Sequence, residues 1–299
     1  MNPLKQLTRA VGLAAMAAVV VGFASPASAS PVPPKADGAL IGTWVNVNSS
    51  TRSVKQVIVT PNDNGSVSVD AFGSCSPTLC EWGSVPAIVY GTSVSATSGL
   101  SFQTDQSFLS GRTEWSRTTL LGTVRKTAVG LRLTLRELTV FEDGSNRKNY
   151  NVTEQFALGR RSKPARLGIA ATGYRRGTPP ALTAAAFGTW TNPTPSGSLV
   201  GLRITGTVAN PVVQAFGQCS PTPCNWGRTG GITFGPSISA TVGGTVLAPY
   251  SFGFKNSQLV ITFYRTATGQ RRLSVAEYSE FTDGSGRSNY TKVEGFVHA

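Results

Sequence analysis

The chain has 299 residues, enough for two ordinary domains, and 40% of them are apolar, so each domain can bury a core. Only 14% are charged, and 33 glycines accompany many Ser, Thr and Val residues, which is typical of short strands and turns rather than of surface helices. The formal net charge of +13 favours anionic partners, and the single histidine, His298, argues against His-centred catalysis.

Residues 1–29 have the pattern of a secretory signal peptide. Lys5 and Arg9 provide a positive start, residues 10–24 are apolar and uncharged, and Ala27-Ser28-Ala29 supplies the small residues of a cleavage site after Ala29. The apolar run is about 15 residues, shorter than the ~20 of a bilayer-spanning helix, and no later segment is apolar enough to span. We therefore expect a secreted protein, with a net charge of +11 once Lys5 and Arg9 are removed.

The remaining chain is one module written twice. The stretch Ala-Phe-Gly-x-Cys-Ser-Pro-Thr-x-Cys-x-Trp-Gly occupies residues 71–83 and returns at residues 215–227. Gly-Thr-Trp-x-Asn opens both copies, at residues 42–46 and 188–192. The predicted organisation is an extended lead-in at 30–41, a first module at 42–156, a basic linker at 157–187 and a second module at 188–296.

Each module is predicted to be a series of short strands separated by turn residues such as Asp143-Gly144 and Asp283-Gly284. In the first module we expect strands at 43–47, 54–60, 66–72, 85–90, 91–96, 118–126, 131–141 and 149–156. Seven or eight strands joined by short turns favour an antiparallel meander, which avoids exposed edges by closing into an up-and-down β-barrel. A β-sandwich is the alternative.

The Gly-Thr-Trp-x-Asn opening of a barrel-sized module resembles the Gly-x-Trp opening of the calycins. Within that group it is most similar to the avidin-type opening, and lipocalins share its Gly-x-Trp part. The resemblance covers about five residues per module and implies closed barrels that bind small ligands inside. No ligand-contacting residue is carried over from these families, and the Cys-x4-Cys-x-Trp-Gly hairpin is not part of their pattern.

The four cysteines are predicted to form two local disulfides, Cys75–Cys80 and Cys219–Cys224, because an exported chain with an even number of closely spaced cysteines is typical of such bonds. A metal site lacks ligands, and the spacing is not that of a redox Cys-x-x-Cys pair. We expect no metal and no cofactor.

Tryptophans occupy two kinds of position in each module. Trp82 and Trp226 follow the disulfides, where each either plugs one end of its barrel or contacts a sugar face or an apolar ligand. Trp44 and Trp190, in the opening strands, are predicted to lie in the core.

Carboxylates share the apolar face of two strands in each copy, because alternate residues of a strand face the same side. These residues are Glu137 and Glu154 in the first module and Glu277 and Glu294 in the second. Buried carboxylates need partners, and Arg125 and Arg265 are the candidates. The glutamates form an internal ion-pair network, a polar floor to a ligand cavity, or a catalytic pair for glycoside cleavage, which a narrow barrel disfavours.

We therefore expect a secreted, non-enzymatic binding protein whose ligand is a carbohydrate or a small molecule. It would be held near Trp82 and Trp226 or over the inward glutamates. The first alternative is an envelope-associated basic protein that binds anionic wall polymer or lipid, and the second is a glycosidase using Glu137 and Glu154. Nucleic acid is not expected as a partner, since much of the positive charge lies in the linker.

Overall fold

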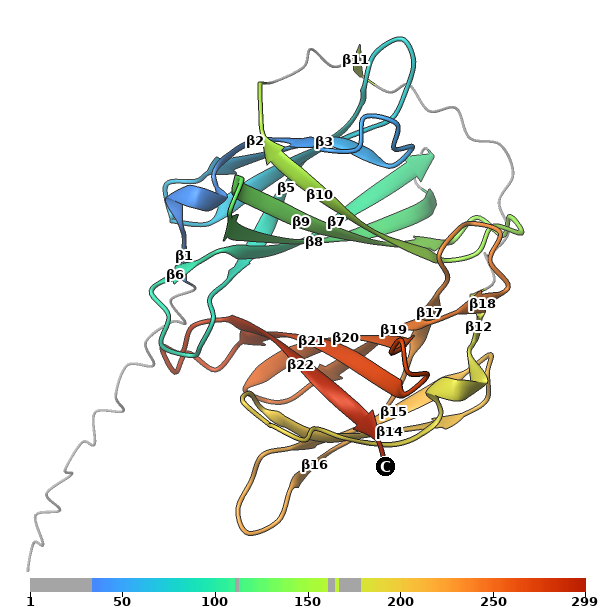
Figure 1. The fold of residues 1–299 in the computed structure, drawn as a ribbon. Coiled ribbons are helices and arrows are strands. Elements are labelled where there is room, and N and C mark those ends of the chain that lie inside the picture. The colour runs from blue at the N-terminus through green and yellow to red at the C-terminus, as the bar shows by residue number, and fades with distance from the viewer. Residues whose placement is uncertain (1–33, 111–112, 161–164, 167–178) are drawn as a thin grey trace, which may run out of the picture.

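The duplicated sequence folds into two β-barrels in tandem, the first drawn in blue to green and the second in yellow to red (Figure 1). A computed structural model describes residues 34–110, 113–160, 165–166 and 179–299. The signal-peptide prediction and most of the basic linker lie outside the described residues. Tandem antiparallel barrels are confirmed, and the sandwich alternative is wrong.

The first barrel is an eight-stranded meander that closes on itself. Its strands are β2 (Gly42–Asn46), β3 (Val54–Pro61), β4 (Val67–Gly73), β5 (Cys80–Tyr90), β7 (Ser101–Ser110), β8 (Thr113–Thr127), β9 (Gly130–Phe141) and β10 (Tyr150–Leu158). Each pairs with its neighbour in the chain, β10 pairs with β2, and β5 pairs with β7. The short strand β11 (Ala165–Arg166) runs parallel to the start of β5.

The second barrel repeats this order with one strand interrupted. Its strands are β13 (Gly188–Thr191), β14 (Leu199–Gly206), β15 (Pro211–Gly217), β16 (Cys224–Gly230), β17 (Ile232–Phe234), β19 (Thr245–Ser251), β20 (Lys255–Arg265), β21 (Arg271–Phe281) and β22 (Tyr290–His298). Strands β16 and β17 form opposite ends of the hydrogen-bonded order and are separated in the chain only by Gly231. One chain segment therefore joins both ends of the sheet.

A short segment before each barrel packs against the end of that barrel opposite its disulfide hairpin. β1 (Lys35–Ala36) pairs with β6 (Ser98–Gly99), β12 (Ala181–Leu182) pairs with β18 (Val242–Gly243), and 3-10 turns follow at η1 (Gly38–Leu40) and η2 (Ala184–Ala186). Trp44 and Trp190, both 0% exposed, donate their indole N–H to the carbonyls of Leu40 and Ala186 at 3.0 and 2.9 Å. The prediction that both tryptophans lie in the core is confirmed.

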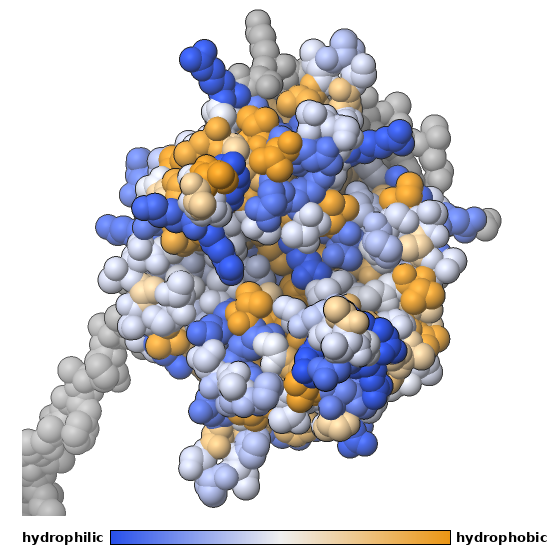
Figure 2. Space-filling model, in the orientation of Figure 1, coloured by the Kyte–Doolittle hydropathy of each residue, from blue (hydrophilic) through white to orange (hydrophobic). Residues whose placement is uncertain are grey.

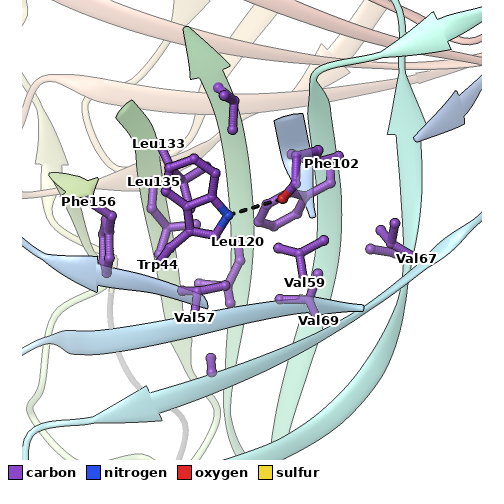
Figure 3. Packing of buried hydrophobic residues seen from close by; sticks show 14 of the residues in the cluster. Trp44, Val57, Val59, Val67, Val69, Phe102, Leu120, Leu133, Leu135 and Phe156 are labelled. Atoms are coloured by element: carbon purple, nitrogen blue, oxygen red, sulfur yellow. Dashed lines mark hydrogen bonds between the residues drawn. The ribbon is translucent and has the colours of Figure 1, made fainter. Parts of the chain in front are cut away.

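Figure 3 shows how period-2 alternation fills the first barrel. Side chains from strands on opposite walls, among them Val57, Val69, Leu120 and Leu133, converge around Trp44. These buried side chains fill the end of the barrel near η1, so that part is a packed core rather than a channel. Burying each of them stabilises the fold by roughly 1.5–3 kcal/mol.

The strand expected at residues 91–96 is wrong. These residues form bends and a turn, and the strand that follows them, β7, was not predicted. Its buried residues Gln103, Thr104 and Gln106 are polar, so β7 lacks the apolar alternation by which strands are recognised.

The two barrels dock through equivalent surfaces of each module. Tyr90, Leu121 and Leu138 of the first barrel form one apolar cluster with Phe234, Val260 and Tyr278 of the second. In the registers of the two barrels, Leu121 corresponds to Val260 and Leu138 to Tyr278. The same patch of each module is therefore used by both, as in the isologous interface of a two-fold dimer.

The backbone contacts across this interface obey the same symmetry. The N–H of Gly91 donates to the Asn289 carbonyl, and the N–H of its counterpart Gly235 donates to the Asn149 carbonyl, both at 2.9 Å. The loop containing Val94 crosses to the second barrel, and the equivalent loop containing Ile238 crosses to the first. Each module thus carries a loop onto the other, which a pair of freely tethered modules would not do.

Polar groups complete the interface. Arg136 donates to the hydroxyls of Thr245 and Thr262 at 3.0 and 2.8 Å, and burial lowers the pKa of this guanidinium to about 10. On the outer face shown in Figure 2, hydrophobic residues form separate patches among hydrophilic ones. The apolar contact between the modules is the buried cluster that contains Tyr90 and Tyr278.

Truncating Tyr278 tests the energetic weight of the docking surface. Its ring meets that of Tyr90 edge-on, with centroids 5.3 Å apart. We expect Tyr278→Ala to lower the free energy of unfolding in urea by about 3 kcal/mol. The control Tyr264→Ala, at a position on β20 that is 44% exposed, should cost no more than about 0.5 kcal/mol. Equal effects of the two variants would contradict this description.

Candidate functional site

The disulfide hairpins lie at the end of each barrel opposite the Trp44 and Trp190 seals. Cys75–Cys80 joins the β4–β5 hairpin and Cys219–Cys224 joins the β15–β16 hairpin, with Cα atoms 5.5 and 5.4 Å apart. Both predicted pairings are confirmed. Such bonds persist in oxidising compartments, which agrees with the expected export.

Trp82 is aimed by the backbone that follows it. Gly83 has φ +93°, and Trp82 and Gly83 together lie opposite one residue of β4, so the strand has a bulge here. An added Cβ at Gly73 would lie 2.7 Å from the indole nitrogen of Trp82. Glycines at both positions therefore let the indole lie across β4, and Gly217, Trp226 and Gly227 repeat the arrangement in the second barrel.

A cavity of about 310 Å³ opens at the mouth of the first barrel beside this tryptophan. Its walls are aromatic, since Trp82, Phe108, Trp115, Phe141 and Tyr150 all line it. Trp82 meets Phe108 edge-on at 5.0 Å. Apolar walls with a few polar groups are typical of small-molecule sites.

The rim of this cavity carries two arginines and a residue from the other barrel. Arg147 lies over the Phe141 ring at 4.1 Å and pairs with Asp143, while Arg52 is exposed. Ile238, on the loop that crosses from the second barrel, also lines the cavity. The site is therefore completed only when both modules are docked.

On β9, the inward-facing residue before Thr139 is Glu137, which lies deeper in the barrel than Thr139, the floor of the cavity. Its side chain is 0% exposed, and one carboxylate oxygen, Oε2, accepts a hydrogen bond from the Ser53 hydroxyl. The other oxygen, Oε1, has no hydrogen-bond partner among the described residues, and neither has the indole nitrogen of Trp115. Burial raises the pKa of Glu137 to about 7, and the nearby Glu154 adds to the shift.

The second mouth has a similar frame, and one of its differences changes the charge inside it. On β8, Ser116 pairs with Phe141; on β20, the corresponding residue is Lys255, which pairs with Phe281. The Lys255 ammonium lies 4.4 Å from the centroid of the Trp226 ring and 3.4 Å from Oε1 of Glu277. That oxygen also accepts hydrogen bonds from the hydroxyls of Ser279 and Tyr290, at 2.6 and 2.7 Å.

The second pair of inward glutamates is held by amide, hydroxyl and backbone donors. Glu154 accepts from Asn46 at 2.6 Å and from the Thr51 hydroxyl. Glu294 accepts from Asn192 at 3.0 Å and from two backbone N–H groups in the β13–β14 turn. These carboxylates therefore brace the first turn of each barrel, and among the described residues no arginine takes part.

The arginine partners expected for the glutamates are wrong. Arg125 is exposed and lies five residues along β8 from Leu120, the partner of Glu137, which is about 16 Å and places it on the opposite face. Arg265 is also exposed and donates to the Gly269 carbonyl at 2.9 Å. The register equates Arg265 with Lys126 rather than with Arg125, so the two are not equivalent positions.

Several site residues escaped the sequence analysis. Phe108 lies on the strand that was not predicted, and Trp115 precedes the part of β8 that was. Lys255 carries a signal in the alignment of the two copies, because a lysine replaces a serine on an inward-facing position. Its meaning depends on knowing that Glu277 lies within reach, and the sequence does not show that.

No family model, curated protein or solved structure matches this chain. Within the described ranges, no group of His, Cys, Asp and Glu side chains is arranged to hold a metal ion. The described helices are the two three-residue turns η1 and η2, and neither is long enough to cross a bilayer.

The pKa of Glu137 makes stability depend on pH. Because this pKa is raised to about 7, the native state holds the proton more tightly than the unfolded chain, and stability is lost as the pH rises through about 7. Between about pH 5 and pH 8, wild type should lose up to about 3 kcal/mol of unfolding free energy relative to Glu137→Gln. Urea unfolding of both proteins across this range measures the difference, and parallel curves would refute it.

Proposed function

We propose that this protein is an exported binding protein whose first barrel holds a small ligand at the mouth beside Trp82. The observation that supports this most directly is the aromatic cavity above a buried carboxylate whose Oε1 has no partner among the described residues. A buried polar atom left unsatisfied costs about 1–3 kcal/mol, so a ligand that bonds to it recovers that energy on binding.

The dimensions of the cavity limit the ligand. A volume of about 310 Å³ is at the small end of ligand pockets, which favours a small molecule or a single sugar ring over a polymer chain. Aromatic walls suit either an apolar group or a sugar face. The glycosidase alternative has less support, since both oxygens of Glu154 are engaged by Asn46 and Thr51.

Export is supported by the signal-peptide pattern of residues 1–29 together with the two disulfides. The calycin-like opening of each module agrees with ligand binding inside a barrel. The two mouths are not equivalent, however, because Lys255 occupies the second one. We therefore assign the ligand to the first barrel alone, in place of two equal sites.

Binding can be tested by ligand-observed NMR with a panel of monosaccharides, alkylamines, alkanols and short carboxylates. At least one member should bind to wild type, and Trp82→Ala should weaken it about tenfold or more, because the indole forms one wall of the cavity. The matched variant Trp226→Ala should leave the affinity unchanged. The proposal fails if no panel member binds or if both variants lose binding equally.

A further inference from the structure

The two barrel mouths allow a comparison within one molecule. Five aromatic or charged positions of the first mouth recur in the second. Their registers and contacts equate Trp82 with Trp226, Phe108 with Phe252, Phe141 with Phe281, Tyr150 with Tyr290, and Glu137 with Glu277. The serine that bonds each glutamate is also repeated, as Ser53 and Ser198.

Against this common frame, position 116 differs in a way that changes the chemistry. Lys255 fills the second mouth, with its ammonium 4.4 Å from the Trp226 ring centroid and 5.6 Å from that of Phe252. The same ammonium pairs with Glu277, and both side chains are buried. At the first mouth Ser116 has no such reach, and the space beside Trp82 is a cavity.

We propose that the mouth of the first barrel binds a primary alkylammonium group, in the position that the Lys255 ammonium takes in the second barrel. This inference rests on the proposed function and names its ligand class. The ligand would be an unbranched amine or the side chain of a lysine, since a four-carbon stem is what the second mouth accommodates.

The binding energy has two sources in this arrangement. A cation over an indole face gains about 2 kcal/mol when water is excluded, and Trp82 provides that face. Oε1 of Glu137, unpartnered among the described residues, corresponds to the oxygen that Lys255 neutralises in Glu277. The ligand would supply the charge that the first barrel lacks.

The arginines at the rim do not exclude a cation. Arg147 is paired with Asp143, and its counterpart Arg287 is paired with Asp283 and lies over Phe281 in the same way. An ammonium therefore coexists with this guanidinium in the second mouth. Arg52 has no counterpart there, but it is exposed, so solvent screens its charge.

The probes are n-butylammonium, its neutral analogue 1-butanol and the anionic pentanoate, titrated while the indole N–H resonances are followed by NMR. We expect n-butylammonium to bind once per chain and the other two to bind at least about tenfold more weakly. The Nα-acetyl-lysine amide forms a further arm. Tighter binding of this compound than of n-butylammonium identifies a lysine side chain as the source of the ammonium, and the reverse identifies a free amine.

Exchanging the residue that differs provides the decisive variants. Ser116→Lys should fill the first mouth and abolish binding of n-butylammonium, whereas Ser107→Lys, which adds the same charge on the exposed face of β7, should not. Lys255→Ser should raise the stoichiometry from one to two. Should Lys255→Ser fail to fold, the pair at positions 116 and 107 still decides.

Ionisation of Glu137 gives an independent readout. The ligand stays charged across neutral pH, so its affinity should rise between about pH 6 and pH 8 as Glu137 loses its proton. The groups that face this carboxyl are the Ser53 hydroxyl, the Val54 backbone N–H, Glu154 and Tyr150, with Arg147 at the rim. Glu137→Gln should flatten the profile and weaken binding roughly thirtyfold or more.

The outcomes separate the inference from the function on which it rests. If 1-butanol or pentanoate binds as tightly as n-butylammonium and depends on Trp82, the first barrel is a binding site but the inference is overturned. If Ser116→Lys binds n-butylammonium as wild type does, the inference is also overturned. If no probe or panel member binds at all, both proposals fail.

Discussion

A carboxylate buried on the apolar inner face of each barrel is the constraint on which the packing at the disulfide end of both modules depends. Removing such a charge from water is costly unless opposite charge or hydrogen bonds replace the lost solvent. In the second barrel, Glu277 is satisfied by Lys255, Ser279 and Tyr290. In the first, Glu137 keeps only Ser53 as a side-chain donor among the described residues, and its pKa rises to about 7. The second barrel satisfies its carboxylate with its own side chains, and in the first the proposed ligand would do so.

Duplication made this difference possible, because two copies of one site can diverge while each retains the frame. The aromatic walls, the disulfide and the bulged glycine after the tryptophan occur in both mouths. The two-fold arrangement adds a further dependence, since Ile238 of the second module lines the cavity of the first, and the equivalent loop residue Val94 accepts a backbone hydrogen bond from Ser288 of the second. A single module would lack this wall. The two barrels are therefore packed as one structural unit rather than as two independently tethered modules.

Much of the fold could be predicted from local patterns. The alternation of Leu133, Leu135 and Glu137 placed the glutamate on the inner face, and the Cys-x4-Cys spacing specified both disulfides. Strand β7 escaped because Gln103, Thr104 and Gln106 are buried through cross-strand and side-chain hydrogen bonds, and polar residues give no apolar period. The arginine partners were wrong because both arginines lie at the far ends of their strands, five and six residues from the cross-strand partners of Glu137 and Glu277, and Arg125 also faces outward.

The sequence by itself determined that the protein is all-β, duplicated and stapled by two hairpin disulfides, because strand period, turn residues and short cysteine loops are local properties. Only the tertiary structure decided which side chains meet. Ser116 and Lys255 are separated from their glutamates by a hairpin, and the pairing register alone brings position 116 or 255 over the carboxylate. The contact between barrels also joins residues more than a hundred positions apart, such as Tyr90 and Tyr278. Such meetings depend on how strands close in space, and no local pattern encodes that closure.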